Sequence, residues 1–90
     1  MIELRITRHA EARARERLCC HDVSEILNRL WKQSRPLDPA DKVEFFWLVE
    51  MPGRVYRVAW YQSVKYVLVA DLSNGVMVTI FSVQSLAGLG

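Results

Sequence analysis

Residues 7–18 read Thr-Arg-His-Ala-Glu-Ala-Arg-Ala-Arg-Glu-Arg-Leu and hold four of the nine arginines of this 90-residue chain. The stretch consists of strong helix formers, and Thr7 is a suitable N-cap, so the sequence predicts a helix that ends at about Leu18. At 100° per residue, Ala10, Ala14 and Leu18 form a narrow apolar stripe. Side chains this small let the helix lie close against a neighbouring element.

A basic row runs along the rim of this stripe. His9, Arg13 and Arg17 recur every four residues and lie within about 80° of one another on the helix. Arg13 and Arg17 are a like-charge pair one turn apart, which costs roughly 0.2–0.5 kcal/mol unless an anion lies between them. Unfavourable local choices of this kind collect at functional sites. The basic row is therefore the first candidate for a binding or catalytic function.

Composition is that of an ordinary globular domain, with 51% hydrophobic and 24% charged residues and a net charge of +2. Residues 1–35 carry eight basic and five acidic side chains, and residues 36–90 carry four basic and five acidic ones. A net charge this small steers nucleic acid only weakly. No segment resembles a membrane span or the apolar core of a signal peptide. Adjacent Cys19 and Cys20 cannot form an ordinary disulfide with each other, so we expect a cytoplasmic protein.

The remaining pattern predicts a single α+β domain over residues 1–90. Alternating apolar residues predict a short strand at 2–6, and a capping box at 22–25 opens a second helix that ends at about Lys32. The proline-containing residues 33–42 are expected to form a loop. Within 43–83, four runs rich in β-branched and aromatic residues predict a four-stranded antiparallel β-meander packed on the helices, with strands at 43–50, 55–61, 65–72 and 76–83.

Two of these runs, 45–49 and 67–70, are apolar at consecutive positions, so both faces of the predicted sheet are apolar. Two helices can cover only one face of a four-stranded sheet. We therefore expect the second face to carry a groove, a dimer contact or a bound partner. Residues 84–90 are expected to form a tail.

Two stretches resemble a known family. One is the pattern His-Ala-x-x-Arg-x-x-x-Arg that begins at His9 and is soon followed by Asp22-Val23. The other is the closing hairpin around Gly75, Val-Leu-Val-Ala-Asp…Gly-Val…Val-Thr-Ile-Phe over 67–81. With the order strand, helix, helix and meander, they make the chain similar to small bacterial members of the RelE/BrnT-like toxin superfamily, whose fold is grouped with barnase, EndoU and colicin-type ribonucleases. Such chains usually have a glycine where this one has Leu18-Cys19-Cys20.

This resemblance implies cleavage of RNA without a metal or another cofactor. His9 would be the general acid or base, and Arg13 and Arg17 would bind the phosphate, because imidazole titrates near neutrality and guanidinium groups match a phosphate that gains charge in the transition state. An antitoxin protein would bind the second sheet face or the helix rim. Further RNA contacts or base stacking would come from strand residues, namely Arg54, Arg57, Tyr56, Tyr61 and Tyr66.

The basic row also has structural interpretations. His9 could be a buried, hydrogen-bonded residue that fixes the helix on the sheet. Arg13 and Arg17 could form ion pairs with Asp71 or Glu44 of the sheet. The sequence leaves these alternatives open beside the catalytic one.

A second class of function is a non-catalytic binding or regulatory module of the same fold, which forms a homodimer or binds a protein partner through the sheet. The near-neutral charge favours this module, and the basic row favours the ribonuclease. The run Cys19-Cys20-His21 has no second cluster of ligands at a suitable spacing, so we predict no metal site.

Overall fold

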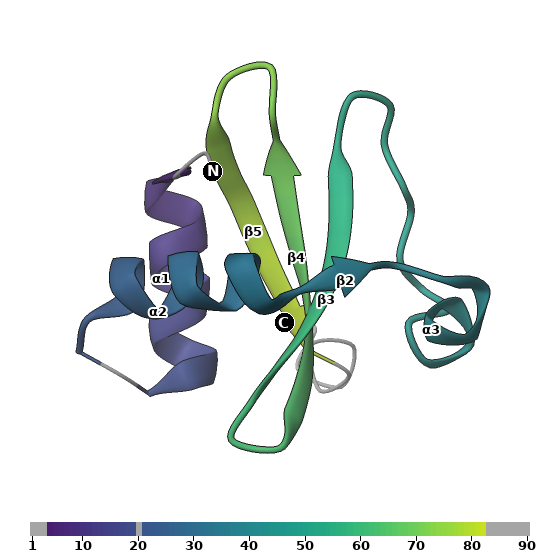
Figure 1. The fold of residues 1–90 in the computed structure, drawn as a ribbon, viewed down its shortest axis with the longest axis horizontal. Coiled ribbons are helices and arrows are strands. Elements are labelled where there is room, and N and C mark those ends of the chain that lie inside the picture. The colour runs from purple at the N-terminus through teal and green to yellow at the C-terminus, as the bar shows by residue number, and fades with distance from the viewer. Residues whose placement is uncertain (1–3, 20, 83–90) are drawn as a thin grey trace.

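The computed structural model describes residues 4–19 and 21–82, which form an α+β fold with helices on both sides of a sheet (Figure 1). The predicted fold class is thus confirmed. The expected tail at 84–90 and the first residues of the expected strand at 2–6 lie outside the described residues. The elements in chain order are β1 (Arg5–Ile6), α1 (Arg8–Leu18), α2 (Val23–Gln33), β2 (Arg35–Pro36), α3 (Pro39–Glu44), β3 (Val55–Tyr61), β4 (Val64–Asp71) and β5 (Val76–Ser82).

The sheet of the described chain has the strand order β1-β5-β4-β3-β2. Strands β3, β4 and β5 form an antiparallel meander of three strands, one fewer than the four predicted. The short strand β1 pairs parallel to β5, and β2 pairs antiparallel to β3. Both edges of the sheet are therefore closed by strands of two residues, which leave little edge for pairing with another chain.

The predicted strand at 43–50 is wrong. Pro39–Glu44 forms the helix α3, and no strand follows it until β3. The side chain of Asp38 accepts a hydrogen bond from the backbone N–H of Asp41 at 3.1 Å, and the Asp41 carboxylate accepts one from the Asp38 N–H at 2.9 Å. This capping box, with Pro39 in the first turn, outweighs the strand propensity of the residues that follow. The predicted loop at 33–42 accordingly contains β2 and the start of α3.

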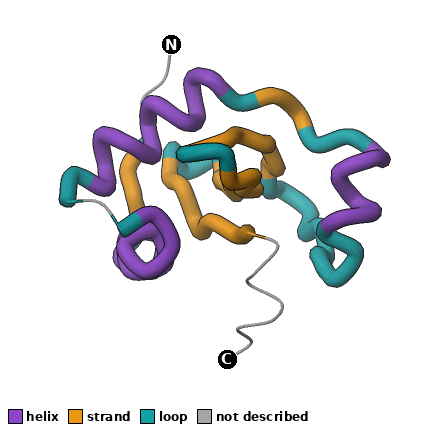
Figure 2. Tube along the Cα trace, turned by 90° about the horizontal axis from the view of Figure 1, so that it is seen from below, coloured by secondary structure: helices purple, strands orange, loops and turns teal. Residues whose placement is uncertain are grey.

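Helices α1 and α2 share one face of the sheet (Figures 1 and 2). The small side chains of Ala10 and Ala14 are fully buried, which brings α1 close to β5. The Thr7 hydroxyl accepts from the Ala10 N–H at 3.1 Å and donates to the Val78 carbonyl at 3.2 Å, so the N-cap of α1 is fixed on β5. These contacts fix how α1 is rotated on the sheet, and therefore which way His9, Arg13 and Arg17 face.

The second face of the sheet is covered by the chain itself. Phe45, at the end of α3, is 1% exposed and packs with Val58, Val67 and Val69. The expectation of a second face that is open to a groove, a dimer or a partner is thereby corrected in part, because the segment 37–51 occupies much of that face. None of the helices in the described ranges is long and apolar enough to cross a membrane.

Cys19 ends α1 in a left-handed backbone conformation with φ of 52°, and its N–H donates to the Arg15 carbonyl. This is a position that glycine fills without steric cost. Replacing Cys19 by glycine should raise the free energy of unfolding by about 0.5 kcal/mol, measured by urea denaturation. Cys19→Ala, which keeps the Cβ, is the control. A glycine variant no more stable than the alanine variant would contradict the left-handed cap.

Candidate functional site

The imidazole of His9 lies in the first turn of α1 and is exposed. Within residues 4–19 and 21–82 its side chain has no hydrogen bond or ion pair. The interpretation of His9 as a buried, hydrogen-bonded residue is therefore wrong. The side chain is accessible to a ligand that approaches the N-terminal half of α1.

Arg13 and Arg17 share a carboxylate of their own helix. Glu16 Oε2 lies 3.2 Å from Arg13 Nη1 and 3.9 Å from Arg17 Nη1. An anion does lie between the two arginines, as their like charge requires, and it is a residue of α1. Burial, and next the charge of Arg13, lower the pKa of Arg17 from its ordinary value. The two guanidinium groups are thus close enough to act on a common anion.

The basic row becomes more buried toward the C-terminus of α1. The Arg13 side chain is 39% exposed and the Arg17 side chain 20%. Arg17 Nη1 donates to the Arg13 carbonyl at 3.4 Å, and the Tyr66 hydroxyl donates to the Arg17 carbonyl at 3.2 Å. Burial raises the pKa of Tyr66. A ligand from solvent therefore meets His9 and Arg13 first.

The two sheet carboxylates that the structural interpretation pairs with Arg13 and Arg17 have other partners. Glu44 accepts a short hydrogen bond from Lys65. Asp71 accepts from the side-chain amide of Asn74 at 2.7 Å, and this bond, ahead of other causes, lowers the pKa of Asp71. The alternative in which Arg13 and Arg17 pair with Asp71 or Glu44 is therefore wrong.

Three of the five predicted RNA-contact residues lie on the helix-covered face of the sheet. Arg57 donates from Nε to Ser34 Oγ at 2.6 Å, and its guanidinium lies 5.7 Å from the centroid of the Trp31 ring. Tyr61 and Tyr66 pack in the core between the sheet and the helices. Tyr66 contacts α1 through its hydroxyl, which donates to the Arg17 backbone carbonyl, and its buried ring is not a stacking surface.

Arg54 and Tyr56 lie on the opposite face, where they line a cavity of about 280 Å³. The Tyr56 hydroxyl accepts from the Met51 N–H at 2.8 Å and donates to the Val49 carbonyl at 3.3 Å. The structure therefore does not bring the five predicted RNA-contact residues together with the basic row on one surface. The cavity is otherwise lined mainly by apolar side chains: Trp47, Leu48, Val49, Met51, Val69, Thr79 and Phe81.

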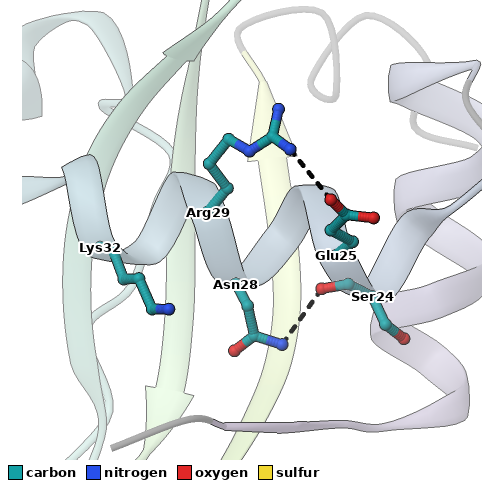
Figure 3. A pocket seen from close by; sticks show the side chains of 5 residues that line it. All are labelled: Ser24, Glu25, Asn28, Arg29 and Lys32. Atoms are coloured by element: carbon teal, nitrogen blue, oxygen red, sulfur yellow. Dashed lines mark hydrogen bonds and ion pairs between the residues drawn. The ribbon is translucent and has the colours of Figure 1, made fainter. Parts of the chain in front are cut away.

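A second cavity lies on the outer side of α2 and is drawn in Figure 3. Its lining residues all belong to this one helix, and four of them are paired: Arg29 with Glu25 at 3.0 Å, and the Asn28 amide with the Ser24 carbonyl at 3.1 Å. It is a hollow between exposed side chains of one helix. Nothing in it converges on a reacting group.

Sequence reasoning missed a charged cluster that fastens α3 to the sheet. Asp41 is 1% exposed and binds the Arg35 guanidinium through two bonds of 2.7 and 2.8 Å, with Lys65 Nζ at 2.5 Å. The Arg35 bonds hold the pKa of Asp41 well below its usual range. Both cations also lie over the exposed ring of Trp60, at 5.3 and 5.7 Å from its centroid. The capping pattern Asp-Pro-x-Asp at 38–41 was the signal for this cluster.

No group of three or more His, Cys, Asp or Glu side chains that could hold a metal ion occurs in the part of the chain that the structure describes. Cys20 lies outside that part, and the Cys19 thiol is exposed. Comparison with protein-family models, with curated proteins and with solved structures finds no match to this chain.

Proposed function

We propose that this protein is a metal-independent endoribonuclease of the toxin type, in which His9 acts as general acid or base and Arg13 and Arg17 bind the phosphate. One observation carries the proposal: the exposed imidazole of His9 has no hydrogen-bond or ion-pair partner among the described residues and lies one helical turn from Arg13 and two turns from Arg17, and these two arginines share one solvent-exposed carboxylate. His9 is also near the positive end of the α1 dipole, which favours an anionic ligand.

The chemistry needs few groups. His9 takes the proton of a ribose 2′-hydroxyl, and the 2′-oxygen attacks the adjacent phosphorus. The bond from phosphorus to the 5′-oxygen breaks, and that oxygen takes a proton from the imidazolium or from water, which leaves a 2′,3′-cyclic phosphate and a 5′-hydroxyl. Arg13 and Arg17 stabilise the charge that grows on the phosphate oxygens. Arg54, which precedes β3, and Tyr56 of β3 lie on the opposite face of the sheet and take no part in this step.

The second candidate is a non-catalytic module that binds a protein partner, either an antitoxin-like protein or a second copy. Large apolar side chains exposed along the segment after the start of α3 favour it: Val43 at 76%, Phe46 at 73%, Val49 at 76% and Met51 at 56%. Side chains of this kind gather at interfaces between proteins. A ribonuclease toxin could bind its antitoxin through the same surface. Partner binding therefore does not distinguish the two candidates, and RNA cleavage does.

Replacing His9 by glutamine should lower the rate of RNA cleavage by the purified protein about 10²–10⁴-fold, the usual contribution of a general acid or base. The measurement is the initial rate on a labelled RNA in the presence of a chelator, with the product end identified as a cyclic phosphate. In cells, induced expression of the wild type should arrest growth, and the His9→Gln, Arg13→Gln double variant should relieve the arrest.

His21→Gln is the matched control, because His21 is also exposed and lies outside the basic row. Its cleavage rate should equal that of the wild type. Equal rates for all three proteins would reject the site. Intact RNA with the wild type, together with harmless expression and a dimer mass in light scattering, would favour the binding module.

A further inference from the structure

We infer that Glu16 is an internal competitor for phosphate and sets the affinity of the basic row for anions. This rests on the proposed phosphate role of Arg13 and Arg17. The Glu16 carboxylate lies 3.2 Å from one guanidinium and 3.9 Å from the other, which is where a bound phosphate oxygen would have to lie to reach both. A carboxylate and a phosphate offer guanidinium the same kind of acceptor oxygens.

The ion pair between Glu16 and Arg13 is weak enough for a phosphate to replace the carboxylate. The Glu16 side chain is 61% exposed, so its ion pair with Arg13 is screened by water and is weak. Without Glu16 the like charges of Arg13 and Arg17 would repel each other across one turn of the helix. Glu16 therefore reduces this repulsion while no ligand is present, and its exposed side chain can turn into solvent when a phosphate binds.

The competitor is always present because it belongs to the same helix. A group tethered this closely acts at an effective concentration in about the millimolar range or above, whatever the solution contains. A single phosphate group must overcome this competition with the contacts it makes to the arginines alone. A phosphate of an RNA strand must displace Glu16 from the two arginines in the same way. Glu16 thus raises the concentration that either ligand, a single phosphate or an RNA strand, needs in order to bind the basic row.

The test compares Glu16→Gln with Glu11→Gln in the full chain. Glu11 lies on the same helix and forms one exposed ion pair, with Arg15 at 2.8 Å, whereas Glu16 contacts both arginines of the basic row. Each variant loses one negative charge, so a difference between them reports the position of the carboxylate. The probes are inorganic phosphate, followed by NMR of the arginine side chains, and a short 2′-O-methyl RNA, which lacks the attacking hydroxyl. Glu16→Gln should tighten the binding of both probes about threefold, the size expected for an exposed ion pair, and Glu11→Gln should tighten it less than half as much.

Adding Arg13→Gln to the Glu16→Gln variant should abolish the gain. Equal tightening by the two glutamate variants would overturn the inference, because a general charge effect would then explain it. An unchanged affinity of the folded Glu16→Gln protein, or no binding by any variant up to about 10 mM phosphate, would overturn it as well. The experiment distinguishes failure of the ribonuclease proposal from failure of the competitor proposal. If Glu16→Gln binds anions more tightly in a way that depends on Arg13, but the wild type leaves RNA intact, only the ribonuclease proposal is rejected. Cleavage that depends on His9, with no special effect of Glu16, rejects the competitor alone.

Discussion

Replacing Phe45 by alanine should lower the free energy of unfolding by about 3–5 kcal/mol. Phe45 is 1% exposed and belongs to the apolar cluster that closes the second face of the sheet, where its ring meets Trp47 edge-on at 5.9 Å between centroids. Truncation removes the apolar contacts of the ring and leaves a cavity beneath α3. Urea denaturation followed by far-UV circular dichroism measures the effect.

Phe46 provides the matched control, because it is the next residue and is 73% exposed. Phe46→Ala should change the stability by no more than about 0.5 kcal/mol. A domain of this size has a total stability of about 5–15 kcal/mol, so Phe45→Ala could leave little folded protein. Phe45→Leu, with a smaller expected loss of about 1 kcal/mol, then keeps the comparison measurable. Equal losses for the alanine variants at 45 and 46 would show that the segment does not cover the sheet in this way.

Replacing Asp41 by asparagine should lower the free energy of unfolding by about 2–3 kcal/mol at neutral pH. The variant keeps the shape of the side chain but removes the charge that Arg35 and Lys65 share. The loss is smaller than for a fully buried pair because the Arg35 side chain is 40% exposed and can return to water. Glu44→Gln is the control: Glu44 is 50% exposed and contacts Lys65 alone among the described cations, so its loss should stay below about 1 kcal/mol.

The effect of Asp41 should depend on pH with a defined sign. The pKa of its carboxyl in the folded protein lies well below the ordinary value, chiefly because of the bonds from Arg35. Its contribution is therefore complete above the pKa of the unfolded chain, about 4, and is lost as the pH falls from there through the folded pKa. The difference in stability between wild type and Asp41→Asn should shrink below about pH 4 in denaturation curves. A difference that stays constant down to about pH 2.5 would contradict the ion-paired carboxylate.

The elements that the sequence predicts well are those whose signals are local. The N-cap at Thr7 and the capping pattern after Asp22 define the starts of α1 and α2, and the Asn74-Gly75 turn, with Gly75 at φ of 65°, joins β4 to β5. The wrong prediction at 43–50 has a local and a long-range cause. Strand propensity and a capping box competed over neighbouring residues, and the predicted strand followed the propensity. The helix α3 forms because Asp41 takes part both in the capping box and in the ion pairs with Arg35 and Lys65.

The sequence by itself determined that His9, Arg13 and Arg17 share one side of a helix, because the helical period fixes that relation. It also indicated that an anion belongs between the two arginines. The tertiary structure alone decided that His9 is exposed, that the Arg17 side chain is only 20% exposed and that the Arg17 carbonyl accepts from Tyr66, because these depend on how α1 packs against the sheet. It likewise decided that Glu44 pairs with Lys65 and not with Arg13 or Arg17. Burial and long-range pairing arise from packing between distant segments, and no local periodicity encodes them.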